Sequence, residues 1–448
     1  MVSLLTRLRF PVSARAWSAP PGARSIFQWL RRGLLVASLG LLLLAAGYSE
    51  FNPSAIDLAA APHKYSILDW ELSNLPDKWL RKLTGVFPGG PTLPREDRIA
   101  QVQEFFQLGL EQGQLERELQ FPEMIAAGKA LSATQPRSLQ DKIGVIEERR
   151  RSLRPGVEET IESEVADVLA QEGLGSRLGL FPPVDAVFSN SPHVLTVSPR
   201  DRIARQQDVL LKPGLSSIKK EQIEERILRE EDLSALVEDT GGVAVYPSVV
   251  MDNAGLHHAV VITTHEWLHH WLFFRPLGRA FWSSPEMTTL NETVATIAGE
   301  ELGDKVFTAL TGEVVVRTPT SSTETPDPNG FDYRAEMQET RIRAEELLAQ
   351  GKVEEAEAYM EERRQLFVAN GYLLRKINQA FFAFHGTYAT SAASVSPIGD
   401  QVRELRTRSD SVAEFLNTAA QFSTYQEFLD YLEELRAKKR ETDSDRRN

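Results

Sequence analysis

The chain of 448 residues contains no cysteine. This absence excludes a thiol nucleophile, a zinc finger built on cysteine ligands and any disulfide bond. It does not fix the cellular compartment, because exported proteins without cysteine are common.

The net charge is strongly negative beyond the first 32 residues. Residues 1–32 carry six arginines and no acid, whereas the whole chain has a net charge of −13, so the remainder carries about −19. A body this acidic repels a phosphate backbone. We therefore expect no nucleic-acid partner.

No apolar run reaches the roughly 20 residues that span a bilayer comfortably. Residues 33–48 come nearest, with sixteen uncharged residues directly after an arginine pair. Two interpretations stay open: a signal peptide, cleaved after Ala45 or Gly47, and an uncleaved signal-anchor helix, which the long basic leader favours. Basic flanks stay cytoplasmic, so both place the rest of the chain outside the cytoplasm. We expect a single-pass protein of a bacterial-type cell membrane, or a secreted one if the segment is cleaved.

Composition divides the remaining chain. Residues 49–93 are rich in proline and glycine and predict a linker. Residues 94–178 show apolar positions at helical spacing and predict a helical region, with helices near 139–153 and 157–172. The tail, residues 439–448, is charged and predicted to be disordered.

Residues 179–438 predict an α+β domain built on one small, mostly antiparallel sheet. Short β-branched segments predict its strands, at 184–188, 194–198, 208–211 and 241–250. An amphipathic helix is expected over 216–238. Residues 313–370 read as an insertion made of a loop and a charged helical hairpin that turns at Gly351.

The chemistry-bearing motif is H-E-x-x-H, formed by His265, Glu266 and His269. Two histidines four residues apart lie on one face of a helix, where their imidazoles can bind one Zn²⁺. Glu266 is placed to take a proton from a water that the metal acidifies. Catalytic zinc also needs a third protein ligand. Glu292, on the next predicted helix, supplies a candidate carboxylate.

H-E-x-x-H followed by N-E-x-x-A at 291–295 resembles the gluzincins, the zinc metallopeptidases that include thermolysin. More narrowly, the blocks at 241–248, 265–274 and 377–390 look like the bacterial "predicted aminopeptidase" group. The resemblance implies a zincin-like fold, zinc bound by His265, His269 and Glu292, and Glu266 as general base and acid. The sequence departs from thermolysin at Thr296, where thermolysin has an aspartate that orients a zinc-bound histidine.

The resemblance implies two further roles. The strand containing Gly242, Val243 and Ala244 would pair with an extended substrate, although it is equally an ordinary sheet strand. His385 or Tyr388 would stabilise the oxyanion, although Tyr388 is equally a packed tyrosine at a helix end.

These features predict a zinc-dependent peptidase that acts on a peptide or protein substrate. Aminopeptidase and endopeptidase action stay open, as does the oligomeric state. The alternative is an inactive, membrane-anchored binding protein that keeps a zinc-supported fold.

Overall fold

The computed structural model describes Ile56 and residues 60–84, 93–120, 136–175, 179–317 and 330–445. The chain divides into two units, Met1–Phe51 and Asn52–Asn448, and every described residue lies in the second. The predicted membrane segment, residues 33–48, falls outside the described residues. Within them, no helix combines the length and apolar character needed to cross a bilayer.

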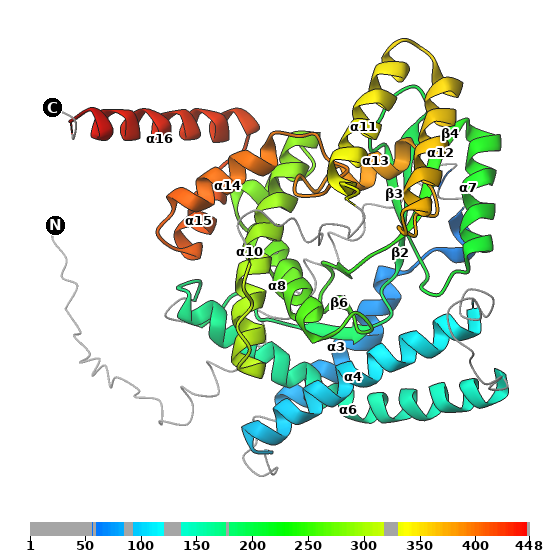
Figure 1. Cartoon of the computed structure of the whole chain (residues 1–448). Coiled ribbons are helices and arrows are strands. Elements are labelled where there is room, and N and C mark those ends of the chain that lie inside the picture. Colours follow the sequence, from blue (N-terminus) through cyan, green and yellow to red (C-terminus); the bar gives the residue numbers. More distant parts are fainter. Residues whose placement is uncertain are drawn as a thin grey trace, which may run out of the picture. The chain divides into compact units, whose positions relative to one another are not determined.

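The described chain is mostly helical and has two small sheets, so the predicted α+β class is confirmed (Figure 1). The elements before the sheets are η2 (Ala61–His63), α3 (Ile67–Thr84), α4 (Arg95–Gln120) and α6 (Pro136–Gln171). The sheet region contains β1 (Ala186–Ser189), β2 (His193–Pro199), β3 (Gln207–Leu211), α7 (Ser217–Glu231), β4 (Leu233–Asp239), β5 (Gly242–Val243) and β6 (Ser248–Met251). The remaining helices are α8 (Leu256–Phe273), α9 (Pro276–Arg279), α10 (Pro285–Thr311), α11 (Tyr333–Ala349), α12 (Val353–Ala369), α13 (Gln379–His385), α14 (Ile398–Arg408), α15 (Val412–Ala419) and α16 (Tyr425–Asp445).

The single predicted sheet is wrong, because the strands form two three-stranded sheets. One is antiparallel with the order β3-β2-β4. In the other, with the order β1-β6-β5, β1 runs parallel to β6 and β5 antiparallel to it. Segment 241–250 accordingly forms two strands instead of one, since residues 244–247 turn the chain back between β5 and β6.

The sequence also misplaced one helix end. The helix expected over 216–238 stops at Glu231, because Asp232 takes a left-handed conformation (φ 52°) that an α-helix does not continue through. Residues Leu233–Asp239 then form β4, which pairs with the fully buried β2. Burial against β2 decides the conformation of this short segment.

Two helices expected near 139–153 and 157–172 are one helix, α6, with Pro155 inside it. A proline inside a helix costs about 3 kcal/mol. Leu153, Val157 and Ile161 lie on both sides of it and are all buried in the same hydrophobic core. Packing of this continuous apolar face offsets the cost of the proline.

The predicted linker contains a helix that packs on the sheet region. Trp70 of α3 donates its indole N–H to the carbonyl of Pro247 at 3.2 Å. Lys78, also on α3, pairs with Glu162 at 2.6 Å and Asp185 at 3.0 Å in a buried network. At the other end, α16 continues to Asp445, contrary to the predicted disordered tail over 439–445, because no glycine or proline interrupts it.

Glu71 of α3 predicts a pH dependence of stability. Burial raises its pKa to about 7, although a hydrogen bond from the backbone of Tyr246 acts against this rise. The folded state therefore favours the protonated carboxyl, and its stabilising contribution is full below about pH 4.5 and lost as the pH rises through 7. We expect Glu71→Gln to be more stable than the wild type at pH 8, by at most about 3 kcal/mol. This difference in the free energy of unfolding should vanish at pH 4. Urea unfolding of both proteins at pH 8 and at pH 4 measures it.

Candidate metal centre

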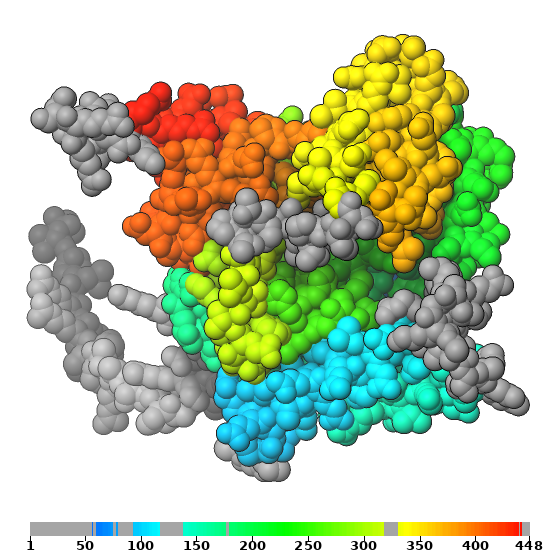
Figure 2. Space-filling view, viewed as in Figure 1, coloured from blue at the N-terminus to red at the C-terminus, as the bar shows by residue number. Residues whose placement is uncertain are grey.

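Helix α8 carries the two histidines and packs along α10, which carries the carboxylate. Ser284 caps α10 by accepting a hydrogen bond from the backbone N–H of Met287, and Pro285 occupies its first turn. In the space-filling view, green atoms from the middle of the chain are set back between the yellow and orange helices and the blue and cyan ones (Figure 2). On this face, segments from both halves of the chain thus border the region of α8.

Three ligating atoms converge in the interior. Nε2 of His265 lies 3.0 Å from Nε2 of His269, and Oε2 of Glu292 lies 3.5 Å and 3.4 Å from these two nitrogens. The three residues form a group whose ligand atoms could hold one metal ion, and it is the one such group found among the described residues.

This donor set fits zinc. Metal–ligand bonds of about 2.0–2.1 Å in a tetrahedron require ligand atoms about 3.3–3.5 Å apart, close to the separations in the triad. Oε2 of Glu292 is buried and accepts no hydrogen bond among the described residues, which is costly for a carboxylate oxygen unless a cation neutralises it. The residues present therefore fit the zinc that the sequence predicts.

The charges within the triad agree with a cation site. Burial opposes ionisation of Glu292, but the two imidazoles hold its pKa well below the usual range. Burial lowers the pKa of His269, whereas the carboxylates of Glu292 and Glu266 raise it to about 9. A proton on His269 and a metal ion thus compete for the same negative charge.

Asn291 orients one of the candidate ligands. Its Oδ1 lies 3.0 Å from Nδ1 of His269, and its amide nitrogen donates to the carbonyl of Leu277 at 3.4 Å. Because an amide oxygen only accepts, Nδ1 of His269 carries the proton and Nε2 presents its lone pair to the site. The sequence did not show which residue orients a histidine of the site, because Thr296 stands where thermolysin has the orienting aspartate. No hydrogen bond from Thr296 to either imidazole occurs in the described structure.

Removing this support should weaken metal binding. We expect Asn291→Ala to reduce zinc affinity by about 10- to 100-fold, because the ring of His269 loses its fixed tautomer and orientation. Asn291→Asp keeps the acceptor and should bind zinc at least as tightly as the wild type. Competition with a chromophoric chelator measures both. Equal affinities for the alanine and wild-type proteins would contradict the assigned role.

Two glycines on α10 allow α10 and α8 to approach closely enough for Glu292 to reach the imidazoles of His265 and His269. A Cβ on Gly303 would lie 2.6 Å from Cα of Val261, and one on Gly299 would lie 3.1 Å from Cα of His265. In both cases the obstacle is α8 backbone, which cannot rotate away as a side chain can.

Gly303→Ala should therefore destabilise the protein and weaken zinc binding together. Alanine gains about 1 kcal/mol of helix propensity, but overpacking against backbone costs about 1–3 kcal/mol and pushes α10 away from α8. The matched control is Gly144→Ala in α6, where a Cβ meets nothing within 4 Å and should stabilise by up to about 1 kcal/mol. Thermal unfolding and zinc titration distinguish the two. Similar behaviour of both variants would contradict the helix-spacing argument.

Glu266 is buried on α8, directly after His265. Burial raises its pKa above the ordinary value, while the charges of His265 and His269 lower it and that of Glu292 raises it. A carboxylate with an elevated pKa is a more effective proton acceptor near neutral pH.

The edge strand β5 comes directly against Glu266. A Cβ on Gly242 would lie 2.6 Å from Oε1 of Glu266 and 2.9 Å from the backbone oxygen of Val249, which cannot rotate away, so glycine is needed there. Within the described residues, β5 pairs on one side only, with β6. Burial lowers the pKa of His270 on α8 to about 4, although the backbone of Ala244 and Val245, in the turn after β5, acts in the opposite direction. Of the predicted substrate-binding residues, Gly242 and Val243 form the strand and Ala244 lies in the turn.

Tyr388 is brought close to the triad. The backbone N–H of Ala389 donates to Oγ1 of Thr293 at 3.4 Å, next to Glu292. The charge of Glu292, followed by burial, raises the pKa of Tyr388 well above its ordinary value. The phenol therefore keeps its proton and remains a hydrogen-bond donor.

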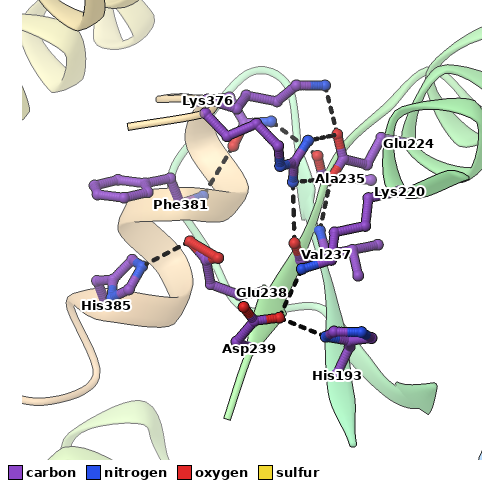
Figure 3. Close-up of polar contacts among 12 residues, drawn as sticks. His193, Lys220, Glu224, Ala235, Val237, Glu238, Asp239, Lys376, Phe381 and His385 are labelled. Atoms are coloured by element: carbon purple, nitrogen blue, oxygen red, sulfur yellow. Dashed lines mark hydrogen bonds and ion pairs between the residues drawn. The ribbon is translucent and has the colours of Figure 1, made fainter. Parts of the chain in front are cut away.

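His385 is not brought to the metal ligands by any described contact. Its Nε2 lies 3.4 Å from Oε1 of Glu238 on β4, as Figure 3 shows. The ring also packs on Phe381, with a centroid distance of 4.4 Å. His385, the last residue of α13, thus pairs with an acid of the antiparallel sheet, three residues before Tyr388.

Arg205 is a charged neighbour that sequence reasoning missed. Its Nη1 lies 3.5 Å from Oγ1 of Thr387, and it forms an ion pair with Asp208. Its charge acts on the pKa of Tyr388 in the direction opposite to that of Glu292. No motif marked it, because it lies in the loop before β3, 182 residues from Thr387.

Comparisons of the chain with protein-family models, with curated proteins and with solved structures found no match in any of the three. The site is therefore interpreted from its own residues.

Proposed function

We propose that this protein is a zinc-dependent peptidase with a zincin-like catalytic domain and that Glu266 is its general base and acid. The observation that carries the proposal is the convergence of His265, His269 and Glu292 on one point beside the buried Glu266. A zinc site with only a structural role has no use for the Glu266 carboxylate.

His265, His269 and Glu292 would hold the metal. Zinc bound there supplies a Lewis acid that polarises the scissile carbonyl and acidifies water. Glu266 accepts the proton of the attacking water and passes it to the leaving amine. Tyr388, which keeps its phenolic proton, donates a hydrogen bond to the oxygen that becomes negative as the water attacks.

The free edge of β5 would align the substrate. An extended peptide that adds to this edge is held by backbone hydrogen bonds, largely independent of its side chains. Gly242 brings that backbone next to Glu266 without a side chain between them. The class of substrate is therefore a peptide or an extended protein segment.

Cleavage of a complex peptide library by purified residues 50–448, with and without a chelator, tests this function. We expect chelator-sensitive cleavage, whose positions in the peptides distinguish aminopeptidase from endopeptidase action. A zinc-loaded, folded protein that cleaves nothing would favour the alternative of a binding protein with a zinc-supported fold.

A further inference from the structure

A polar cavity of about 280 Å³ lies between α6, α4 and the loops that follow β1 and β6. Three arginines of α6 line it, together with two carboxylates and the amides of Gln112 and Asn190. Its volume is below the range of about 300–1,000 Å³ typical of drug-sized ligands, so it suits a small solute.

The cavity is separate from the metal centre. Asp252, which lines it, precedes the first residue of α8 by four positions. His265 lies nine residues further along α8 than Leu256, about 14 Å at the rise of an α-helix. The metal site and its proposed reaction therefore do not account for these arginines.

Positive charge exceeds negative charge in the cavity lining, which has three guanidinium groups and two carboxylates. Nη2 of the buried Arg150 lies 2.8 Å from Oδ2 of Asp252 and also donates to its backbone carbonyl at 2.8 Å. Nη2 of Arg154 lies 3.7 Å from the same carboxylate oxygen. Two guanidinium groups thus share one carboxylate. The positive charge that this carboxylate leaves unbalanced attracts an additional anion.

A ligand that also offers a proton would satisfy a buried acceptor of the cavity. Oδ1 of Asp252 is buried and receives no hydrogen bond within the described structure, although the side chain is only 3% exposed. Nε of Arg154 likewise has no acceptor there. An ammonium donor would be repelled by the two guanidinium groups. The matching donor is therefore an O–H carried by an anion.

We propose that this cavity binds inorganic hydrogen phosphate. Its oxygens accept hydrogen bonds from Arg154 and the neighbouring donors, and its O–H donates to Oδ1 of Asp252. Sulfate and phosphodiesters offer the same kind of acceptor oxygens but no proton at neutral pH, so they would place an oxygen against the Asp252 carboxylate. The cavity is thereby selective for phosphate.

The test compares inorganic phosphate with sulfate at equal ionic strength, using calorimetric titration and thermal unfolding of the full chain. We expect phosphate to bind with one site and to raise Tm, and sulfate to bind at least tenfold more weakly. Arg154→Gln should weaken phosphate binding about tenfold or more. The matched control is Arg149→Gln on the same helix, because Arg149 pairs with Glu104 at the surface and does not line the cavity.

Three outcomes would overturn the proposal: no phosphate binding by the wild type, equal binding of sulfate and phosphate, or an equal loss in the two arginine variants. The last two would show general attraction of anions to α6. Because these readouts involve neither zinc nor peptide cleavage, the result does not depend on the proposed peptidase activity.

Discussion

Glu266→Gln is expected to lower kcat/KM for peptide cleavage by about 10³-fold and to leave the metal bound. The amide has nearly the size of the carboxylate but cannot accept the proton of the attacking water or return it to the leaving amine, and such proton transfer contributes about 10²–10⁴-fold. The three candidate metal ligands, His265, His269 and Glu292, are untouched by the change. Initial cleavage rates and the zinc content of the purified variant measure the two effects separately.

The matched control for this experiment is Glu286→Gln, the same chemical change at an exposed position in the first turn of α10. It should cleave like the wild type. If Glu266→Gln retained full activity, Glu266 would not be the general base. If it lost activity together with its zinc, the carboxylate would instead belong to the metal-binding set.

Removal of the metal should abolish cleavage and also destabilise the fold. A metal ion that binds only the folded state, at about 1,000 times its dissociation constant, adds about 4 kcal/mol to the free energy of unfolding. In its absence, the charge of Glu292 is balanced in the interior chiefly by a proton on His269, whose pKa is about 9. We therefore expect the metal-free protein to unfold at a lower temperature and zinc to restore both stability and activity.

Glu292→Gln should remove most of this zinc-dependent stabilisation, because it replaces the one anionic ligand with a weakly coordinating amide. Glu301→Gln is the control on the same helix, since Glu301 pairs with Arg406 at 2.8 Å and not with the imidazoles. It should keep the full zinc-dependent rise in Tm, whatever its own stability. An unchanged zinc response in Glu292→Gln would contradict the assignment of the third ligand.

Elements whose signal is local were predictable. The strands near β1, β2 and β3 and the hairpin of α11 and α12 follow from residue pattern and turn chemistry, and Gly351 indeed has a positive φ of 73° at the hairpin turn. Elements decided by distant partners were not. β4 continues a helical pattern and becomes a strand because β2 lies beside it, and α6 stays helical through Pro155 because one core covers both of its halves.

The same division applies to the metal centre. The amino-acid sequence alone determined that His265 and His269 face one way, since four residues are about one helical turn. Only the tertiary structure decided that Glu292 reaches them, because α8 and α10 meet at the backbone contacts of Gly299 and Gly303. The tertiary structure likewise brought Asn291 within hydrogen-bond distance of Nδ1 of His269, and Arg205 within hydrogen-bond distance of Thr387, the residue before Tyr388. Local periodicity sets the direction of a side chain, whereas the distance between two ligands on different elements depends on how closely those elements pack.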